Sequence, residues 1–164
     1  MRAEAEMEGG IAVTETSIHM SPDQIDSFLA EPRHAVVGVV RSDGAPQLSP
    51  VWILYDNGLV YFSIFVDSAK YRQLERDPRI SICVDAGHPD ARAVMIQGTA
   101  ELARETSVSY EDLSFRINRH YHESDDAARR YMEQTKAQGP GALVIVSPKE
   151  MCFRRSYFSA VRSK

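Results

Sequence analysis

A chain of 164 residues, 26% of them charged and 43% hydrophobic, is long enough to form one domain with its own core. Its net charge of −4 argues against nucleic acid as a main partner, because phosphate-backbone binding needs a net basic face. No apolar run approaches the ~20 residues that a membrane helix needs, and the glutamate-rich start lacks the apolar segment of a secretory signal. We therefore expect a cytoplasmic protein with no membrane partner, a flexible tail at residues 1–20 and a single domain over residues 21–164.

The predicted elements begin with a helix that Ser21 caps. Pro22 suits the first helical position, Gln24 can complete a capping box, and Pro32 ends the helix. About six strands follow, most of them antiparallel, over residues 35–40, 47–55, 59–66, 79–85, 93–102 and 142–146, the last open to a continuation near Cys152.

Three features of the strands predict their places in a sheet. Residues 35–40 are apolar at every position, which is typical of a strand buried on both faces. Pro50 interrupts the alternation of residues 47–55 and indicates an edge or a bulge. Tight turns are expected at residues 42–44 and 56–58, since Asp-Gly and Asn-Gly pairs favour hairpins.

Helices interrupt the strands twice. A short helix over about residues 68–77 separates two strands, and a pair of helices forms an insertion at about 105–138 before the last strand. In the pair, Tyr110, Ile117 and Tyr121 share one face, and Ser124 is the expected cap of the second helix. Short strands, tight turns and the absence of βαβ alternation predict a mainly β fold, a Greek-key-like antiparallel barrel with peripheral helices.

The short helix offers a candidate anion site. Ser68 caps it, and Lys70 and Arg72 lie in its first turns, where free backbone N–H groups and the helix dipole favour negative charge. Lysines and arginines on helices are also often simply solvated. Ser63, with Gln47 and Ser49 two strands away, would complete a cleft suited to a planar heterocycle with a phosphorylated tail.

Other chemistries lack a signature. The chain has no GxGxxG, GxxxxGK[ST] or GxSxG motif. Cys83 and Cys152 lie in apolar runs, where buried reduced thiols are expected, and no Cys/His metal spacing occurs. His120 and His122 are two positions apart on a predicted helix, so they point away from each other and predict no metal site.

Several spaced motifs resemble the pyridoxamine 5'-phosphate oxidase-like FMN-binding split-barrel superfamily, and within it the flavin/deazaflavin oxidoreductases that depend on coenzyme F-420. The resemblance covers about residues 22–103. The motifs are Gly44-Ala-Pro-Gln-Leu-Ser-Pro-Val51, Ser63-Ile64, Ser68-Ala-Lys-Tyr-Arg-Gln-Leu-Glu-Arg-Asp-Pro-Arg79 and Gln97-Gly-Thr-Ala-Glu-Leu102.

The resemblance implies an oxidoreductase that acts as a homodimer, with two cofactor sites at its interface. It places the cofactor phosphate at Ser68, Lys70 and Arg72. It places the ring system beside Gln47, Ser49, Pro50 and Ser63.

Departures from the family pattern favour F-420 over FMN. The oxidases carry an arginine and a lysine on the second strand that grip the FMN phosphate, and Ser49 and Leu54 stand at the matching positions here. The Arg-Leu-x-Pro ending that binds the oxidases' substrate is also absent. The leading prediction is F-420-dependent hydride transfer to an unidentified small organic substrate.

Three alternatives stay open. They are an FMN-dependent oxidoreductase, a non-catalytic binder of a flavin, deazaflavin or haem, and a purely structural dimer module. The sequence identifies no catalytic residue. Tyr71 and Tyr121 are conceivable proton donors, but packing is the expected role of both.

Overall fold

The computed structural model of the chain describes residues 20–90, 92–105 and 109–155, with the backbone alone for residues 152–155. The tail expected at residues 1–20 falls, up to residue 19, outside the described residues, as does the Cys152 side chain. None of the described helices is long and apolar enough to cross a membrane.

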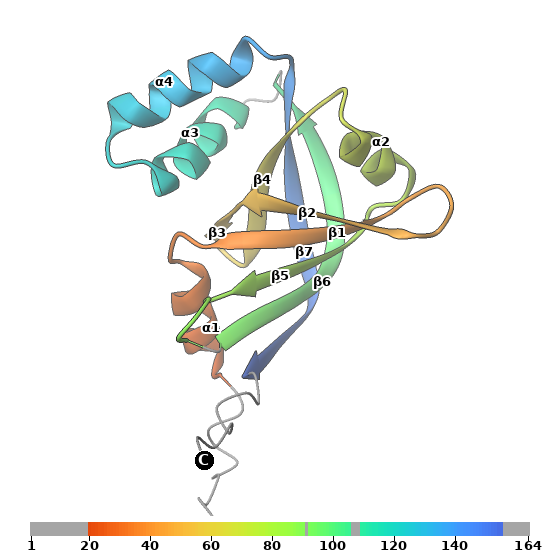
Figure 1. The fold of residues 1–164 in the computed structure, drawn as a ribbon, viewed down its shortest axis with the longest axis vertical. Helices are drawn as coiled ribbons and strands as arrows, with labels where there is room; N and C mark the ends of the chain where they lie inside the picture. Colours follow the sequence, from red (N-terminus) through yellow and green to blue (C-terminus); the bar gives the residue numbers. More distant parts are fainter. Residues whose placement is uncertain (1–19, 91, 106–108, 156–164) are drawn as a thin grey trace, which may run out of the picture.

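The described residues form four helices and seven strands (Figure 1). The helices are α1 (Pro22–Leu29), α2 (Ala69–Arg76), α3 (Tyr110–Tyr121) and α4 (Asp125–Lys136). The strands are β1 (His34–Val40), β2 (Pro46–Trp52), β3 (Leu54–Asp56), β4 (Leu59–Phe65), β5 (Arg79–Asp85), β6 (Arg92–Arg104) and β7 (Gly141–Arg155).

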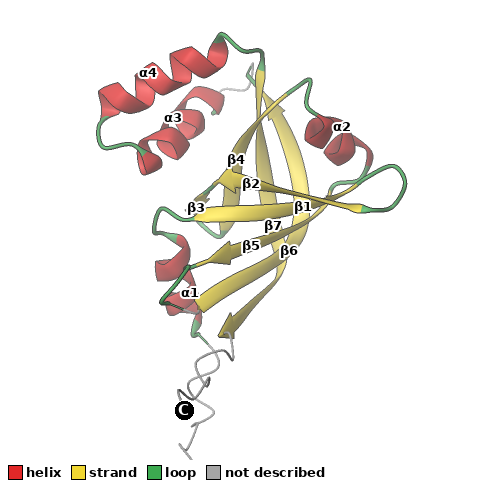
Figure 2. Ribbon diagram, in the orientation of Figure 1, coloured by secondary structure: helices red, strands yellow, loops and turns green. Residues whose placement is uncertain are grey.

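All seven strands belong to one antiparallel sheet, in the order β2-β1-β5-β6-β7-β4-β3 (Figure 2). The two edge strands, β2 and β3, are consecutive in the chain and are separated only by Ile53. The sheet must therefore curl until its two edges meet at this residue, which gives a half-barrel. The predicted fold class, a mainly antiparallel β-barrel with peripheral helices, is confirmed, with seven strands in place of about six.

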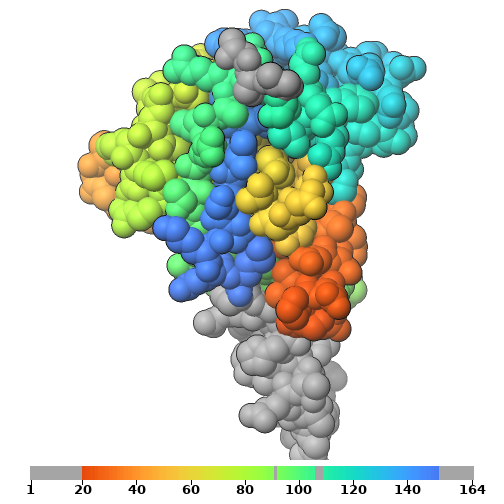
Figure 3. Space-filling view, turned by 180° about the vertical axis from the view of Figure 1, so that it is seen from behind, coloured from red at the N-terminus to blue at the C-terminus, as the bar shows by residue number. Residues whose placement is uncertain are grey.

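The core lies inside the curl. Inward positions alternate with exposed ones along β1 and β5, and Val37, Ile82 and Ile96 are almost fully buried. Seen from behind, β7 runs as a stripe between β6 on one side and β3 and β4 on the other (Figure 3). Such burial of aliphatic side chains is the main stabilising contribution to the fold.

Local signals in the sequence are confirmed at the helix caps and turns. Ser21 and Gln24 form the reciprocal capping box of α1, and Ser124 Oγ caps α4 by accepting the Ala127 N–H. Asn57 and Gly58 have φ angles of 50° and 77°, as a tight hairpin turn between β3 and β4 requires.

Two predicted strands have different boundaries in the structure. The strand expected over 47–55 is broken at Ile53, because the Tyr121 hydroxyl from α3 bonds the Ile53 N–H and C=O. The last strand is longer than 142–146 and runs without interruption through β7, paired along β6 with one irregularity at Gln97/Gly98.

Two burial predictions were wrong. Residues 35–40 are not buried on both faces, since Val36 is 43% exposed on the outer face of the sheet. Cys83 lies on that same face and is half-buried, not buried in the core. A continuous apolar run can therefore include outward-facing residues, and those of β1 and β5 are not fully covered by the described residues.

The helical pair lies at one end of the sheet, and α1 lies toward the other (Figure 1). On α3, Tyr110 and Ile117 pack against Leu54 and Leu143 and form a second small core. Through α3 the pair packs against β2, β3, β4 and β7, where it adds a wall to the open end of the half-barrel.

Candidate functional site

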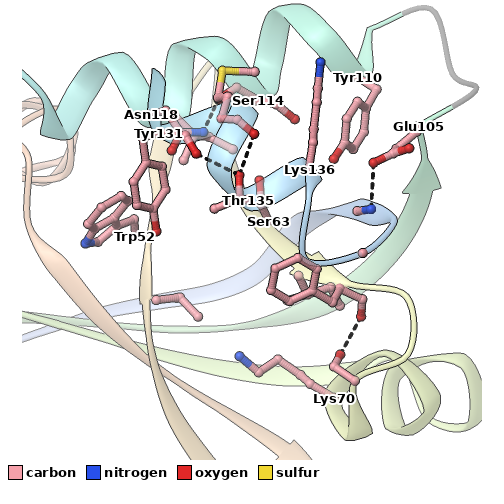
Figure 4. Close-up of a pocket in the computed structure, with 18 of the residues that line it drawn as sticks. Trp52, Ser63, Lys70, Glu105, Tyr110, Ser114, Asn118, Tyr131, Thr135 and Lys136 are labelled. Carbon is pink, nitrogen blue, oxygen red and sulfur yellow. Dashed lines mark hydrogen bonds between the residues drawn. The ribbon is translucent and has the colours of Figure 1, made fainter. Parts of the chain in front are cut away.

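A pocket of about 590 Å³ lies between β2, β4, the start of α2, and the helical pair α3 and α4 (Figure 4). Its size falls within the range of natural small-molecule sites. Lys70 lies at its floor, and Ser114, Asn118 and Thr135 lie on the side formed by the helices.

Lys70 is the distinctive charge of the pocket. Its side chain is half-buried, and among the described residues its ammonium has neither a hydrogen bond nor an ion pair. The Nζ atom lies 5.9 Å from the centroid of the Phe62 ring. Burial lowers the pKa of Lys70, because the charged form loses hydration that no protein anion replaces.

The start of α2 lies beside Lys70 and is capped as the sequence predicts. Ser68 Oγ accepts the Tyr71 N–H at 3.2 Å and donates to the Phe65 carbonyl at 2.6 Å. The first main-chain bond of the helix runs from the Arg72 N–H to Ser68 O, so the amides of Ala69 and Lys70 precede it and have no intrahelical acceptor. Free amides and an unpaired ammonium together favour an anion at this end of the pocket.

Four of the seven predicted site residues line the pocket: Pro50, Ser63, Ser68 and Lys70. The other three do not line it, and each is engaged or enclosed elsewhere. Gln47 accepts a hydrogen bond from Gln73, Ser49 Oγ is buried without a partner, and the Arg72 guanidinium donates to the Asp67 carbonyl. Whether any of the seven binds a cofactor stays a prediction.

An aromatic cluster closes one side of the pocket. Trp52 stacks on Tyr121 with ring centroids 5.0 Å apart and planes 9° apart. The Tyr131 ring packs on Trp52 with centroids 5.2 Å apart and planes inclined by 42°. Trp52 Nε1 also donates to His34 Nε2 at 2.9 Å. Trp52, Tyr131 and His34 line the pocket, so the cluster presents an aromatic wall of inclined rings to it.

The opposite corner contains a polar group around Gly141. Glu105 accepts the Gly141 N–H at 2.7 Å, and the Tyr110 side chain lies against the same glycine. Burial raises the pKa of the Tyr110 hydroxyl, and a contact with Ser114 opposes that shift. This contact falls short of a hydrogen bond, because Ser114 Oγ has no partner of acceptable distance and angle among the described residues.

Sequence reasoning missed the lining that α3 and α4 provide. Ser114, Asn118 and Thr135 face the pocket, together with Tyr131 and Met132. The available signal was the i, i+4 spacing of Ser114 and Asn118 beside apolar positions of α3, which puts polar groups on a partly buried face. Tyr71 and Tyr121 do not line the pocket. The Tyr71 hydroxyl accepts from Arg104, and that of Tyr121 is bonded to backbone groups.

No group of three or more His, Cys, Asp or Glu side chains that could bind a metal occurs in the described part of the chain. His120 and His122 lie at the end of α3, and His122 Nδ1 lies 2.7 Å from the Asn118 carbonyl.

A curled antiparallel sheet with a pocket at its open end defines this molecule as a split β-barrel protein. The chain belongs to the pyridoxamine 5'-phosphate oxidase family, whose profile matches residues 21–154. The predicted superfamily is therefore confirmed.

Three solved structures illustrate the similarity. A conserved hypothetical protein from Mycobacterium tuberculosis is 20% identical, with a TM-score of 0.71 over 90% of this chain and 92% of that chain. An F420 reductase is 20% identical, with a TM-score of 0.58 over 77% of this chain and 94% of that chain. HutZ, a heme storage protein from Vibrio cholerae, is 16% identical, with a TM-score of 0.63 over 79% and 92% of the two chains. At these identities the likeness establishes the fold, which serves different functions in different proteins.

Proposed function

We propose that this protein is an oxidoreductase that uses coenzyme F-420 to transfer a hydride to a small organic substrate. The observation that carries the proposal is Lys70, a half-buried ammonium at the floor of a large pocket, which forms no ion pair with any of the described residues. A buried cation without a partner is unfavourable unless a ligand supplies the missing charge. The cofactor's anionic tail is the ligand that would do so.

The residues of the pocket fit such a cofactor. Lys70, Ser68 and the amides at the start of α2 would hold its phosphate, while Ser63 and Pro50 would border its ring. Ser63 is exposed to the pocket on β4, and Pro50 belongs to the edge strand β2. When bound, the deazaflavin supplies the hydride chemistry, and the protein contributes position and electrostatics.

F-420 is favoured over FMN because the cations that grip the FMN phosphate in the oxidases are missing. Ser49 and Leu54 stand at those positions. Leu54 is 8% exposed and packs in the small core under α3, and Ser49 Oγ is buried. Neither position offers positive charge, which leaves Lys70 as the cation for the phosphate.

Two other functions have some support. The tyrosines considered as proton donors, Tyr71 and Tyr121, are engaged away from the pocket, which favours a non-catalytic flavin or deazaflavin binder. His34 is a pocket-lining histidine that a haem iron could use, but its Nε2 already accepts the Trp52 N–H. Tight F-420 binding without turnover across a broad substrate panel would favour the non-catalytic role.

The decisive experiment titrates the purified protein with F-420 and with FMN, and repeats both titrations on two lysine variants. Lys70→Ala should weaken F-420 binding about 10- to 100-fold, the worth of a charge-assisted contact, with little loss of stability. Lys136→Ala is the matched control, because Lys136 lines the same pocket but is paired with Glu111 and Glu133.

Equal F-420 affinity in the wild type and Lys70→Ala would contradict the site assignment. Tighter binding of FMN than of F-420 would replace the proposed cofactor with FMN.

The proposal includes a homodimer with cofactor sites at its interface. Pro50, Val36, Cys83 and Met95 are register partners in one row across β2, β1, β5 and β6. Val36 is 43% exposed and Met95 37%, so the row forms an apolar stripe on the outer face of the sheet. Pro50 also lines the pocket, which links this stripe to the proposed cofactor site.

A further inference from the structure

We infer that the side of the pocket beneath α3 and α4 binds a substrate without negative charge that has a flat, unsaturated body and one hydrogen-bonding group. This inference rests on the proposed function, because that function assigns the Lys70 end to the anionic cofactor and leaves the helical side for the substrate. Three features of the helical side each restrict what can bind there. They are its aromatic wall, the unpaired Ser114 hydroxyl and the ion pairs that Lys136 already makes.

The aromatic wall consists of Trp52 and Tyr131, which lie side by side in Figure 4 with their ring planes inclined by 42°. Tyr121 supports the Trp52 ring by stacking at 5.0 Å, and the bond to His34 fixes its edge. A ring that is already held in place loses little freedom when a ligand packs on it. Planar π systems stack on such surfaces, so a flat ligand fits this wall better than a puckered one.

The unpaired hydroxyl belongs to Ser114. This residue is 4% exposed, lines the pocket, and has no hydrogen-bond partner for its Oγ among the described residues. On the next turn, Asn118 is 8% exposed and donates its Nδ2 to the Ser114 carbonyl. A buried polar group without a partner is unfavourable, and a ligand carbonyl or amide reaching α3 would satisfy it.

The charged side chains on this side already have partners within the protein. Lys136 is shared between Glu111 at 3.5 Å and Glu133 at 3.6 Å, and its side chain is 43% exposed at the rim. Glu105 accepts the Gly141 N–H. An anionic substrate beneath the helices would therefore be buried without a free cation, which is strongly unfavourable. The helical side therefore selects against a negatively charged substrate.

The test uses the single tryptophan of the chain as its reporter. The Trp52 indole N–H gives one resonance in a proton–nitrogen NMR spectrum, and a ligand stacked on the wall must shift it. The probes are 2-naphthamide and 2-naphthoate, which match in shape and differ in charge. Each is titrated into the full-length protein, without F-420 and with saturating F-420. With saturating F-420, and in the Lys70→Ala variant, where no free cation among the described residues lies in the pocket, we expect 2-naphthamide to shift the Trp52 resonance and to bind at least about tenfold more tightly than 2-naphthoate.

Two variants separate this inference from the proposed function. Ser114→Ala should weaken 2-naphthamide binding about three- to tenfold, the worth of one neutral hydrogen bond, and leave F-420 affinity unchanged. Lys70→Ala should weaken F-420 binding and leave 2-naphthamide affinity unchanged. The amide spectrum shows directly whether each variant is folded.

The inference would be overturned by an unshifted Trp52 resonance, or by full 2-naphthamide affinity in folded Ser114→Ala. It would also be overturned if 2-naphthoate bound more tightly than 2-naphthamide once Lys70 is covered by F-420 or replaced by alanine. A failed F-420 titration beside a positive 2-naphthamide result would overturn the proposed function alone.

Discussion

Gly141 sets the shape of the pocket corner next to the helical pair. A Cβ at this position would lie 2.0 Å from the Tyr110 hydroxyl oxygen and 3.3 Å from Glu105 Oε1. No real Cβ tolerates the first distance, so only glycine lets Tyr110 lie flat against the start of β7. The same residue donates its N–H to Glu105, which fixes the turn into the strand.

Replacing Gly141 with alanine should lower the free energy of unfolding by about 1–3 kcal/mol, the usual cost of overpacking a close contact. Chemical denaturation measures the change. The double variant Gly141→Ala/Tyr110→Phe is the control, because it removes the clashing hydroxyl and should recover part of the loss. An alanine variant as stable as the wild type would show that Tyr110 moves aside freely.

At the scale of elements, Tyr121 of α3 is hydrogen-bonded to the backbone at Ile53, where the two edge strands β2 and β3 meet. Its hydroxyl oxygen lies 2.6 Å from the Arg33 carbonyl and 2.9 Å from the Ile53 carbonyl, so its single proton is shared between these two acceptors, and it accepts the Ile53 N–H at 3.0 Å. Ile53 is 1% exposed, so water cannot replace these bonds. One hydroxyl thus satisfies the backbone that the break between β2 and β3 leaves unpaired.

Tyr121→Phe should therefore destabilise the protein by about 1–3 kcal/mol, because it leaves buried backbone groups without partners. Tyr131→Phe is the matched control and should change stability very little, since Tyr131 is 36% exposed. Urea denaturation of the three proteins measures both effects. Equal stabilities of Tyr121→Phe and wild type would mean that the junction is held by packing alone.

A second link between elements joins α1 to β3. The Tyr55 hydroxyl donates to Asp26 at 2.6 Å. Burial, and then the Asp26 carboxylate, raise the pKa of Tyr55 from 10.0 to about 12. The folded protein therefore keeps this proton over a pH range in which the unfolded chain has already lost it.

The raised pKa of Tyr55 makes the protein less stable at high pH. The unfolded state binds fewer protons than the native state between about pH 10 and pH 12, so stability falls as the pH rises through this range. Tyr55→Phe lacks this contribution, and the difference in unfolding free energy between wild type and variant should shrink toward pH 12. Denaturation at a series of pH values measures it. A difference that stays constant with pH would show that the Tyr55–Asp26 bond does not shift the tyrosine's ionisation.

Features that depend on neighbouring residues could be predicted from the sequence, whereas features that depend on distant contacts could not. Capping residues and Asn-Gly turns act locally, so Ser21, Ser124 and the turn at Asn57 were predicted correctly. The break at Ile53 depends on Tyr121, 68 positions away, and no local pattern contains that contact. Among the site residues, Lys70 stood out through its place at a helix start. Ser114 reaches the pocket only through the packing of α3 on the sheet.

At the scale of the whole molecule, the outer face of the sheet carries exposed apolar side chains that the described residues leave uncovered. The stripe of Pro50, Val36, Cys83 and Met95 is joined on this face by Leu48, which is 69% exposed. Contiguous exposed apolar side chains usually mark an interaction surface. A second copy of the chain is the proposed partner, because the stripe reaches the pocket at Pro50.

Val36→Lys should therefore convert the proposed dimer to a monomer, because it places a charge in the middle of the apolar stripe. Size-exclusion chromatography with light scattering measures the mass of the variant and of the wild type. F-420 affinity should fall with the loss of the dimer, since Pro50 would no longer be held against the partner. Glu101→Lys is the control on β6, at a position that is exposed and already charged, and it should leave the mass unchanged. A monomeric wild type would contradict the homodimer itself. A Val36→Lys dimer with full F-420 affinity would place the interface on another face and separate it from the cofactor site.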